Sequence, residues 1–305
     1  MNNTSANNKR IAKNTLFLYV RMFFIMAVTL YTSRVVLNTL GVVDFGIYNV
    51  VGGVVAMMNI LNGAMSVSTQ RYLTFELGRG DTVRLKQVFS TCLQIFFLIS
   101  LLVVLLGETV GLWFLNTQMV IPIERVSAAN WVYQFSILAC VASLMVNPFN
   151  ATIIAHERMN VYAYMGILEV VLKLGVVYLL LVLPADRLAT YGGLIFLSQV
   201  IVTSFYIVYC RRHFEESHYR FYWEKPLFME LVSYSGWNLF GSLSGLAKGQ
   251  GLNILLNLFF NPAVNAARGI AYQINAAITQ FFTNFYTAVR PQITKYYAQG
   301  DLEEM

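Results

Sequence analysis

Eight long apolar runs divide this sequence and leave only short polar segments between them. A helix needs about 20 largely apolar residues to cross the hydrocarbon of a bilayer. The runs cover roughly residues 14–38, 46–70, 88–115, 131–155, 162–183, 189–210, 232–259 and 267–289. The sequence therefore predicts an all-α fold, namely a polytopic helical membrane protein with about eight transmembrane helices.

The composition agrees with this class and excludes others. Charged residues make up only 12% of the 305 residues, hydrophobic residues make up 57%, and the mean hydropathy is +0.58. A soluble domain carries about 25% charged residues, so this chain cannot build a polar shell. An ordinary cytosolic enzyme, a disordered chain and a disulfide scaffold are excluded.

Candidate residues for catalysis or metal binding are missing from the sequence pattern. Cys92, Cys140 and Cys210 fall in or beside apolar runs without CxxC spacing, which predicts free, buried thiols. The three histidines lie in polar loops, and no HExxH pattern occurs. We therefore expect a protein that is not an enzyme and that uses no metal or cofactor.

Basic residues are distributed unequally between the two sides of the expected bundle. Of the 21 basic residues, 14 lie in loops on one side and 2 in loops on the other. Lysine and arginine accumulate in cytoplasmic loops, so both termini are predicted to be cytoplasmic. The same distribution explains the net charge of +6 without nucleic-acid binding.

An internal repeat relates the second and eighth runs. Residues 71–81 follow the second run and residues 291–301 follow the eighth, and both segments end in Gly-Asp. The repeat predicts a first six-helix bundle over residues 1–222 and the start of a second bundle over residues 223–305. Transporters use parallel repeats to place a site between two rocking halves. A complete second bundle would need further helices, so the chain is expected to be a fragment or a shortened form.

Four segments carry a resemblance to a known family. They are residues 10–16 (RIAKNTL), 33–48 (SRVVLNTLGVVDFGIY), 234–241 (YSGWNLFG) and 261–273 (NPAVNAARGIAYQ). These segments resemble the Wzx-type O-unit flippases, a polysaccharide flippase family within the multidrug/oligosaccharidyl-lipid/polysaccharide exporter (MOP) superfamily. The resemblance covers the whole chain but departs at the C-terminus, because members of the family usually have more helices.

The resemblance implies a transport function for surface polysaccharide biosynthesis, such as the O-antigen of lipopolysaccharide. The implied substrate is an oligosaccharide linked to undecaprenyl diphosphate, moved from the inner to the outer leaflet of the cytoplasmic (inner) membrane by alternating access of two helix bundles. Polysaccharide polymerase machinery is an implied partner, beside the lipid bilayer and the lipid-linked substrate.

An anionic diphosphate needs positive charge that is shielded from the lipid tails. Lys173 and Lys248 lie near the centres of the fifth and seventh runs and are the first candidates to contact it. For Lys173, an ion pair with Glu169, one helical turn earlier, is an equally good interpretation. Lys248 has no acidic neighbour in its own run.

Three arginines are further candidates for substrate binding. Arg21 lies about 10 Å into the first run and is expected to face a cavity. Arg34 follows 13 residues later, which places it roughly 140° around a straight helix, so both cannot face one cavity. Snorkelling to the interface is the alternative for each. Arg268 begins the eighth run, either as a gate residue or as an interfacial anchor.

Polar stripes occur in the two repeat-equivalent runs. Asn59 and Asn62 lie on one face of the second run, and Asn275 and Thr279 lie on one face of the eighth. The stripes indicate a wet interior, although hydrogen bonds between helices also use these residue types.

Competing functions differ in the charges and loops that they require. A cation-coupled multidrug exporter of the same superfamily would favour a buried carboxylate, whereas the charges within these runs are mostly basic. A membrane-embedded glycan enzyme would need a long outward loop, and the outward loops here are short. An inactive fragment is a third alternative. The segment 211–225, which joins the two predicted bundles, is expected either to lie on the inner leaflet or to be a solvated linker.

Overall fold

The computed structural model describes residues 2–119, 121–183, 186–259 and 262–301. Within these ranges the side chains of residues 2–8, 54, 56–60, 246, 249–259, 262–270, 273, 274 and 277 are not described. The described residues form helices and connecting turns and contain no strand.

Eight long helical stretches account for the eight apolar runs of the sequence. The α-helices are α1 (Asn2–Arg79), α2 (Thr82–Leu106), α3 (Leu112–Thr117), α4 (Val126–Ala155), α5 (Met159–Val182), α6 (Arg187–His213), α7 (Lys225–Phe259) and α8 (Pro262–Gln299). The short turns are η1 (Gly107–Gly111), which continues α2 into α3, η2 (Ile123–Arg125) and η3 (Glu215–Ser217). Among the residues described, five stretches are long and apolar enough to cross a membrane. The prediction of an all-α, polytopic membrane protein is confirmed.

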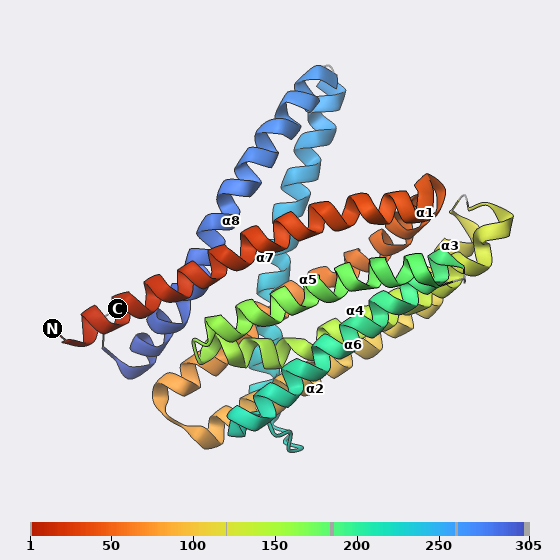
Figure 1. The fold of residues 1–305 in the computed structure, drawn as a ribbon. Coiled ribbons are helices and arrows are strands. Elements are labelled where there is room, and N and C mark those ends of the chain that lie inside the picture. The colour runs from red at the N-terminus through yellow and green to blue at the C-terminus, as the bar shows by residue number, and fades with distance from the viewer. Residues whose placement is uncertain (1, 120, 184–185, 260–261, 302–305) are drawn as a thin grey trace.

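A single glycine, Gly41, connects the first two predicted spans within α1. Gly41 has φ 77° and ψ 169°, a conformation that side chains with a Cβ rarely adopt. The chain reverses there. The first limb of α1 (residues 2–40) runs away from the end of the molecule where the chain begins, and the second limb (residues 42–79) runs back toward that end (Figure 1).

The two copies of the Gly-Asp repeat end their helices in the same way. Gly80 has φ 72° and Gly300 has φ 75°. The amide of Gly80 donates to the carbonyl of Leu77 at 3.3 Å, and the amide of Gly300 donates to the carbonyl of Tyr297 at 3.2 Å. Glycine is the residue that ends a helix most readily in this left-handed conformation. The helices that precede the two Gly-Asp pairs therefore end with the same backbone conformation, while the division into two bundles stays a prediction.

Both termini lie at one end of the bundle, here called the terminus side, and the turn at Gly41 lies at the opposite end, called the far side (Figure 1). The helices α1 to α6 pack side by side around an apolar core that includes Phe89, Phe96 and Tyr133, each fully buried. Cys92, Cys140 and Cys210 are buried and form no disulfide among the described residues, as predicted.

The hairpin of α7 and α8 packs on the bundle only toward the terminus side (Figure 1). There, Tyr72 of α1 donates to Glu230 of α7 at 3.0 Å, and the guanidinium of Arg71 lies 4.6 Å from the ring centre of Tyr234. Farther along the hairpin, Trp237 is 73% exposed and Phe282 is 68% exposed. The ribbons of the hairpin and the bundle therefore diverge toward the far side.

A glycine brings α1 and α8 into close contact at the terminus side. A Cβ at Gly78 would lie 2.8 Å from the Cβ of Ala298 and 2.9 Å from the Cα of Lys295. We expect Gly78→Ala to push these helices apart and to lower the free energy of unfolding by about 1–3 kcal/mol, the usual cost of overpacking.

Thermal unfolding of the purified protein in detergent measures this effect. Gly63→Ala in the same limb is the matched control, because a Cβ at Gly63 meets no atom within 4 Å. Equal melting temperatures for the two variants would contradict the predicted close contact.

Candidate functional site

A polar pocket lies inside the first six helices. It measures about 190 Å³ and opens between both limbs of α1, α5 and α6. Its lining residues are Thr29, Thr32, Ser33, Val36, Phe45, Tyr48, Asn49, Val170, Lys173 and Tyr191. Lys173 is the charged member of this lining and stands beside hydroxyl and amide groups, so the pocket suits a polar group.

The reversal at Gly41 is what assembles this pocket. Thr29, Thr32 and Ser33 lie on one face of the first limb, because three- and four-residue spacings return to the same face of a helix. The second limb runs back beside the first and brings Tyr48 and Asn49 to the same pocket. The spacing of these three polar residues is visible in the first run of the sequence, but the spacing alone does not indicate that they line a pocket.

Lys173 both lines the pocket and forms an ion pair. Its Nζ lies 2.6 Å from Oε1 of Glu169 on the same helix. The side chains are 40% and 36% exposed, so neither charge is sealed. The two interpretations that the sequence left open for Lys173 are therefore compatible, and the pair contributes no net charge.

Arg21 lies in the interface between the first limb and α5. Its guanidinium carbon is 4.3 Å from the ring centre of Tyr162, within the range of a cation–π contact. A Cβ at Gly166 would lie only 2.3 Å from Nε of Arg21, so the arginine fills the space that this glycine leaves. Within the described part of the chain, no carboxylate pairs with Arg21, and its Nε is buried without a hydrogen-bond partner.

The first limb carries three more buried polar atoms in the same condition, on Asn14, Thr15 and Thr32, and two of them lie on the helix face of Arg21. Nδ2 of Asn14 and Oγ1 of Thr32 have no hydrogen-bond partner among the described residues. The separations from Arg21 are 7 and 11 residues, and both are close to whole turns of a helix. Buried polar groups are normally satisfied, so these three groups, spread over about 27 Å of one helix face, are separate candidates for contact with water or a ligand.

One face of α5 completes this arrangement. Tyr162, Gly166, Glu169 and Lys173 follow each other at separations of 4, 3 and 4 residues, which places them on one face of the helix. Together with Arg21 they provide two positive charges and one negative charge. The excess of one positive charge within the bundle is the main electrostatic property of the site.

The remaining predicted site residues are not brought to this pocket. Arg34 is exposed on α1, and Lys248 is exposed in the second half of α7. Asn275 and Thr279 are exposed on α8, where the hydroxyl of Thr279 lies 3.3 Å from Oδ1 of Asn275. Their roles in substrate binding stay predictions.

Asn62 forms a hydrogen bond between helices, which was the alternative to a wet interior for the polar stripe of the second run. Its Oδ1 accepts a hydrogen bond from Nδ2 of Asn147 in α4. The side chains of Asn59 and Arg268 lie outside the residues that the structure describes.

A cluster around Glu157 joins the bundle to α8 at the terminus side. Glu157 lies in the turn between α4 and α5 with φ 58°, and its side chain is only 3% exposed. Its carboxylate lies 2.9 Å from Nε of Arg10 and 2.8 Å from Nζ of Lys295, and it accepts a hydrogen bond from Gln292 at 3.0 Å. Three separate elements therefore meet at one buried carboxylate. The sequence did not reveal this cluster, because no local pattern marks Glu157.

Comparison with solved structures identifies the fold as that of MOP superfamily transporters. A multidrug resistance MATE family transporter of this superfamily, in an outward-facing conformation, gives a TM-score of 0.80 at 13% identity, over 98% of this chain and 66% of that chain. The Vibrio cholerae MATE transporter VcmN in the bent form gives 0.76 at 15% identity, over 100% of this chain and 69% of that chain.

A third similar structure is a MOP superfamily transporter from Pyrococcus furiosus Vc1, whose binding pocket of reverse polarity suggests a different function. It gives a TM-score of 0.76 at 14% identity, over 98% of this chain and 66% of that chain. This chain thus spans about two thirds of the length of such transporters. At these identities the likeness establishes the fold. No family model matches the sequence, and no curated protein does.

Proposed function

We propose that this chain acts in transport and moves an oligosaccharide linked to undecaprenyl diphosphate from the inner to the outer leaflet of the cytoplasmic membrane. The terminus side then faces the cytoplasm, in agreement with the distribution of basic residues. Residues 1–222 form one moving body in this proposal, and residues 223–305 belong to the other. The activity is a physical translocation without covalent chemistry.

The observation that carries the proposal is the positive charge of Arg21, which has no carboxylate partner among the described residues and lies on the same helix face as Thr32 of the polar pocket. A charge within a membrane protein is costly unless it is paired or serves a ligand. Arg21 has no carboxylate partner among the described residues, and three buried polar atoms on its helix face lack partners. A diphosphate supplies both the negative charge and the hydrogen-bond acceptors that the guanidinium of Arg21 requires.

The arrangement of the helices supports a direction for this transport. The Glu157 cluster and the Gly78 contact hold α8 against the bundle at the terminus side. Toward the far side the hairpin and the bundle diverge (Figure 1). A state that is closed toward the cytoplasm and open toward the outer leaflet would release a flipped headgroup.

Complementation tests the proposal. We expect the protein to restore surface O-antigen in a bacterial strain that lacks its own O-unit flippase, and Arg21→Gln to abolish this restoration. Lys13→Gln is the matched control, because Lys13 is an exposed cation on the same limb of α1. Immunoblots of isolated membranes must give similar levels for all variants. Full restoration by Arg21→Gln would remove Arg21 from the site.

A cation-coupled multidrug exporter is the second candidate function. Glu169 favours it, because this carboxylate lies at mid-helix beside the pocket and such groups can bind a coupling cation. The similar MATE family structure described above is a multidrug resistance transporter. Under our proposal, expression in a drug-sensitive strain leaves drug resistance unchanged. A gain in resistance that is lost in Glu169→Gln would favour the exporter instead.

A further inference from the structure

The segment that joins α6 to α7 is ordered against α2 rather than being a solvated linker. Nε2 of Gln94 donates to the hydroxyl of Tyr219 at 3.3 Å, and the amide of Arg220 donates to the hydroxyl of Ser90 at 3.4 Å. Gln94 lies three turns into α2. Residues 218–224, here called the aromatic segment, therefore reach along a predicted membrane span.

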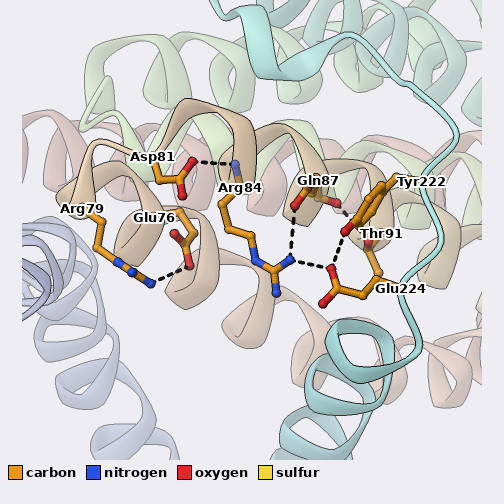
Figure 2. A network of polar contacts seen from close by, with 8 residues as sticks. All are labelled: Glu76, Arg79, Asp81, Arg84, Gln87, Thr91, Tyr222 and Glu224. Atoms are coloured by element: carbon orange, nitrogen blue, oxygen red, sulfur yellow. Dashed lines mark hydrogen bonds and ion pairs between the residues drawn. The ribbon is translucent and has the colours of Figure 1, made fainter.

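A charged network fixes the end of the aromatic segment (Figure 2). Nη1 of Arg84 lies 2.6 Å from Oε2 of Glu224, and the same oxygen accepts a hydrogen bond from the hydroxyl of Tyr222. The adjacent guanidinium lowers the pKa of Glu224 below its ordinary value, so this carboxylate is charged at neutral pH. The network holds Tyr222 and Glu224 toward α2.

The residues between these anchors line an apolar pocket. Successive side chains of an extended chain point to opposite sides. Tyr219, Phe221 and Trp223 accordingly face a pocket of about 500 Å³, whose other walls include Phe97 and Leu98 of α2. Phe221 is 78% exposed. An aromatic surface of this size in contact with water is unfavourable, so this surface requires a hydrocarbon partner.

A second apolar pocket continues the first along α2. It measures about 290 Å³, and its walls come from the second limb of α1, α2 and α7. Leu98 lines both pockets, and Leu102 and Val232 extend the second one. Because the two pockets share Leu98, they are adjacent along α2, and together they are here called the groove, an apolar surface between the aromatic segment and α7 that suits a hydrocarbon chain.

The charges around the aromatic segment leave a positive excess. Its three flanking carboxylates are each held by a basic group: Glu215 by Lys86, Glu216 by His156 and Glu224 by Arg84. Four basic residues of the same region have no carboxylate partner within the described part of the chain: Arg211, Arg212, Arg220 and Lys225. The rim of the groove is therefore positively charged on the terminus side.

We propose that this groove is a binding site for an anionic phospholipid of the terminus-side leaflet. An acyl chain lies in the groove along α2, and the negative headgroup lies at the basic rim around Arg220. Tyrosine and tryptophan prefer the level of the headgroups, and cationic residues attract anionic lipids there. The site is separate from the pocket at Lys173 and does not depend on the transport proposal.

Quenching of tryptophan fluorescence by brominated lipids tests this site. Two variants each keep one tryptophan, Trp223 or Trp113, with phenylalanine at the other tryptophan positions. Both tryptophans are 56% exposed, but Trp113 lies in α3 on the far side. In phosphatidylcholine vesicles, we expect brominated phosphatidylglycerol to quench Trp223 about twofold more than the same fraction of brominated phosphatidylcholine. Trp113 should respond equally to both lipids.

Arg220→Gln in the variant that keeps Trp223 is expected to remove the preference for the anionic lipid. Arg79→Gln, an exposed cation at the α1–α2 turn outside the groove lining, should retain it. Equal quenching of Trp223 by the two lipids would overturn the proposal. Quenching of Trp113 without quenching of Trp223 would also overturn it, because the aromatic segment would then lie outside the bilayer.

Discussion

Replacing Glu157 by glutamine is expected to lower the free energy of unfolding by about 3 kcal/mol, the lower end of the cost of breaking a buried ion pair. Glutamine keeps the shape and one acceptor but removes the charge that faces Arg10 and Lys295. The carboxylate is 3% exposed, whereas the two partner side chains are 52% and 25% exposed. Because these partners can rehydrate in part, we do not expect the full cost of an uncompensated buried charge.

Thermal and chemical unfolding in detergent measure this loss. Glu124→Gln is the matched control, because Glu124 is an exposed carboxylate in η2 on the far side. A second change distinguishes electrostatics from packing: Lys295→Gln in the Glu157→Gln background should recover part of the stability, because it removes a cation that has lost its ion pair with Glu157. Additive losses in the double variant would contradict a charge cluster at Glu157.

The Glu157 cluster also has a consequence for the proposed transport cycle. It links the N-terminal end of α1, the α4–α5 turn and the end of α8 at one carboxylate. Rocking of two bundles requires this junction to open when the far side closes. We expect Glu157→Gln to weaken the closed state of the terminus side, so any loss of complementation should exceed the loss of folded protein.

The membrane-spanning architecture was predictable because hydrophobicity alone specifies it. A run of apolar residues long enough to cross a bilayer must satisfy its backbone internally, and a helix does so. The Gly-Asp repeat was equally visible, and the left-handed glycines at positions 80 and 300 give it a structural basis. The Lys173–Glu169 ion pair followed from the four-residue spacing of the two residues.

The contacts between distant helices were not predictable in this way. Arg21 and Gly166 are 145 residues apart, and nothing in either run indicates that the glycine makes room for the arginine. Glu157 is one carboxylate in a polar turn, and its partners come from the two ends of the chain. A side chain such as Asn62 suits a cavity and a contact between helices equally well. Its role becomes clear only when the facing helix is known, here α4 with Asn147.

The interface between Arg21 and Gly166 gives the second large effect that we expect. The Cβ of Gly166→Ala would lie 2.3 Å from Nε and 3.0 Å from the guanidinium carbon of Arg21. The arginine must therefore leave its position over Tyr162, or the helices must separate at an overpacking cost of about 1–3 kcal/mol. Either outcome displaces the guanidinium from its place over Tyr162, so we expect surface O-antigen to be lost, as with Arg21→Gln.

Gly175→Ala in the same helix is the control for this prediction. A Cβ at Gly175 meets no atom within 4 Å, and alanine is a better helix former than glycine by about 1 kcal/mol. We expect Gly175→Ala to keep complementation and to raise the melting temperature slightly, while Gly166→Ala reaches the membrane but restores no O-antigen. If Gly166→Ala transports normally, the position of Arg21 does not matter for the substrate, and the positive excess within the bundle has a structural role instead.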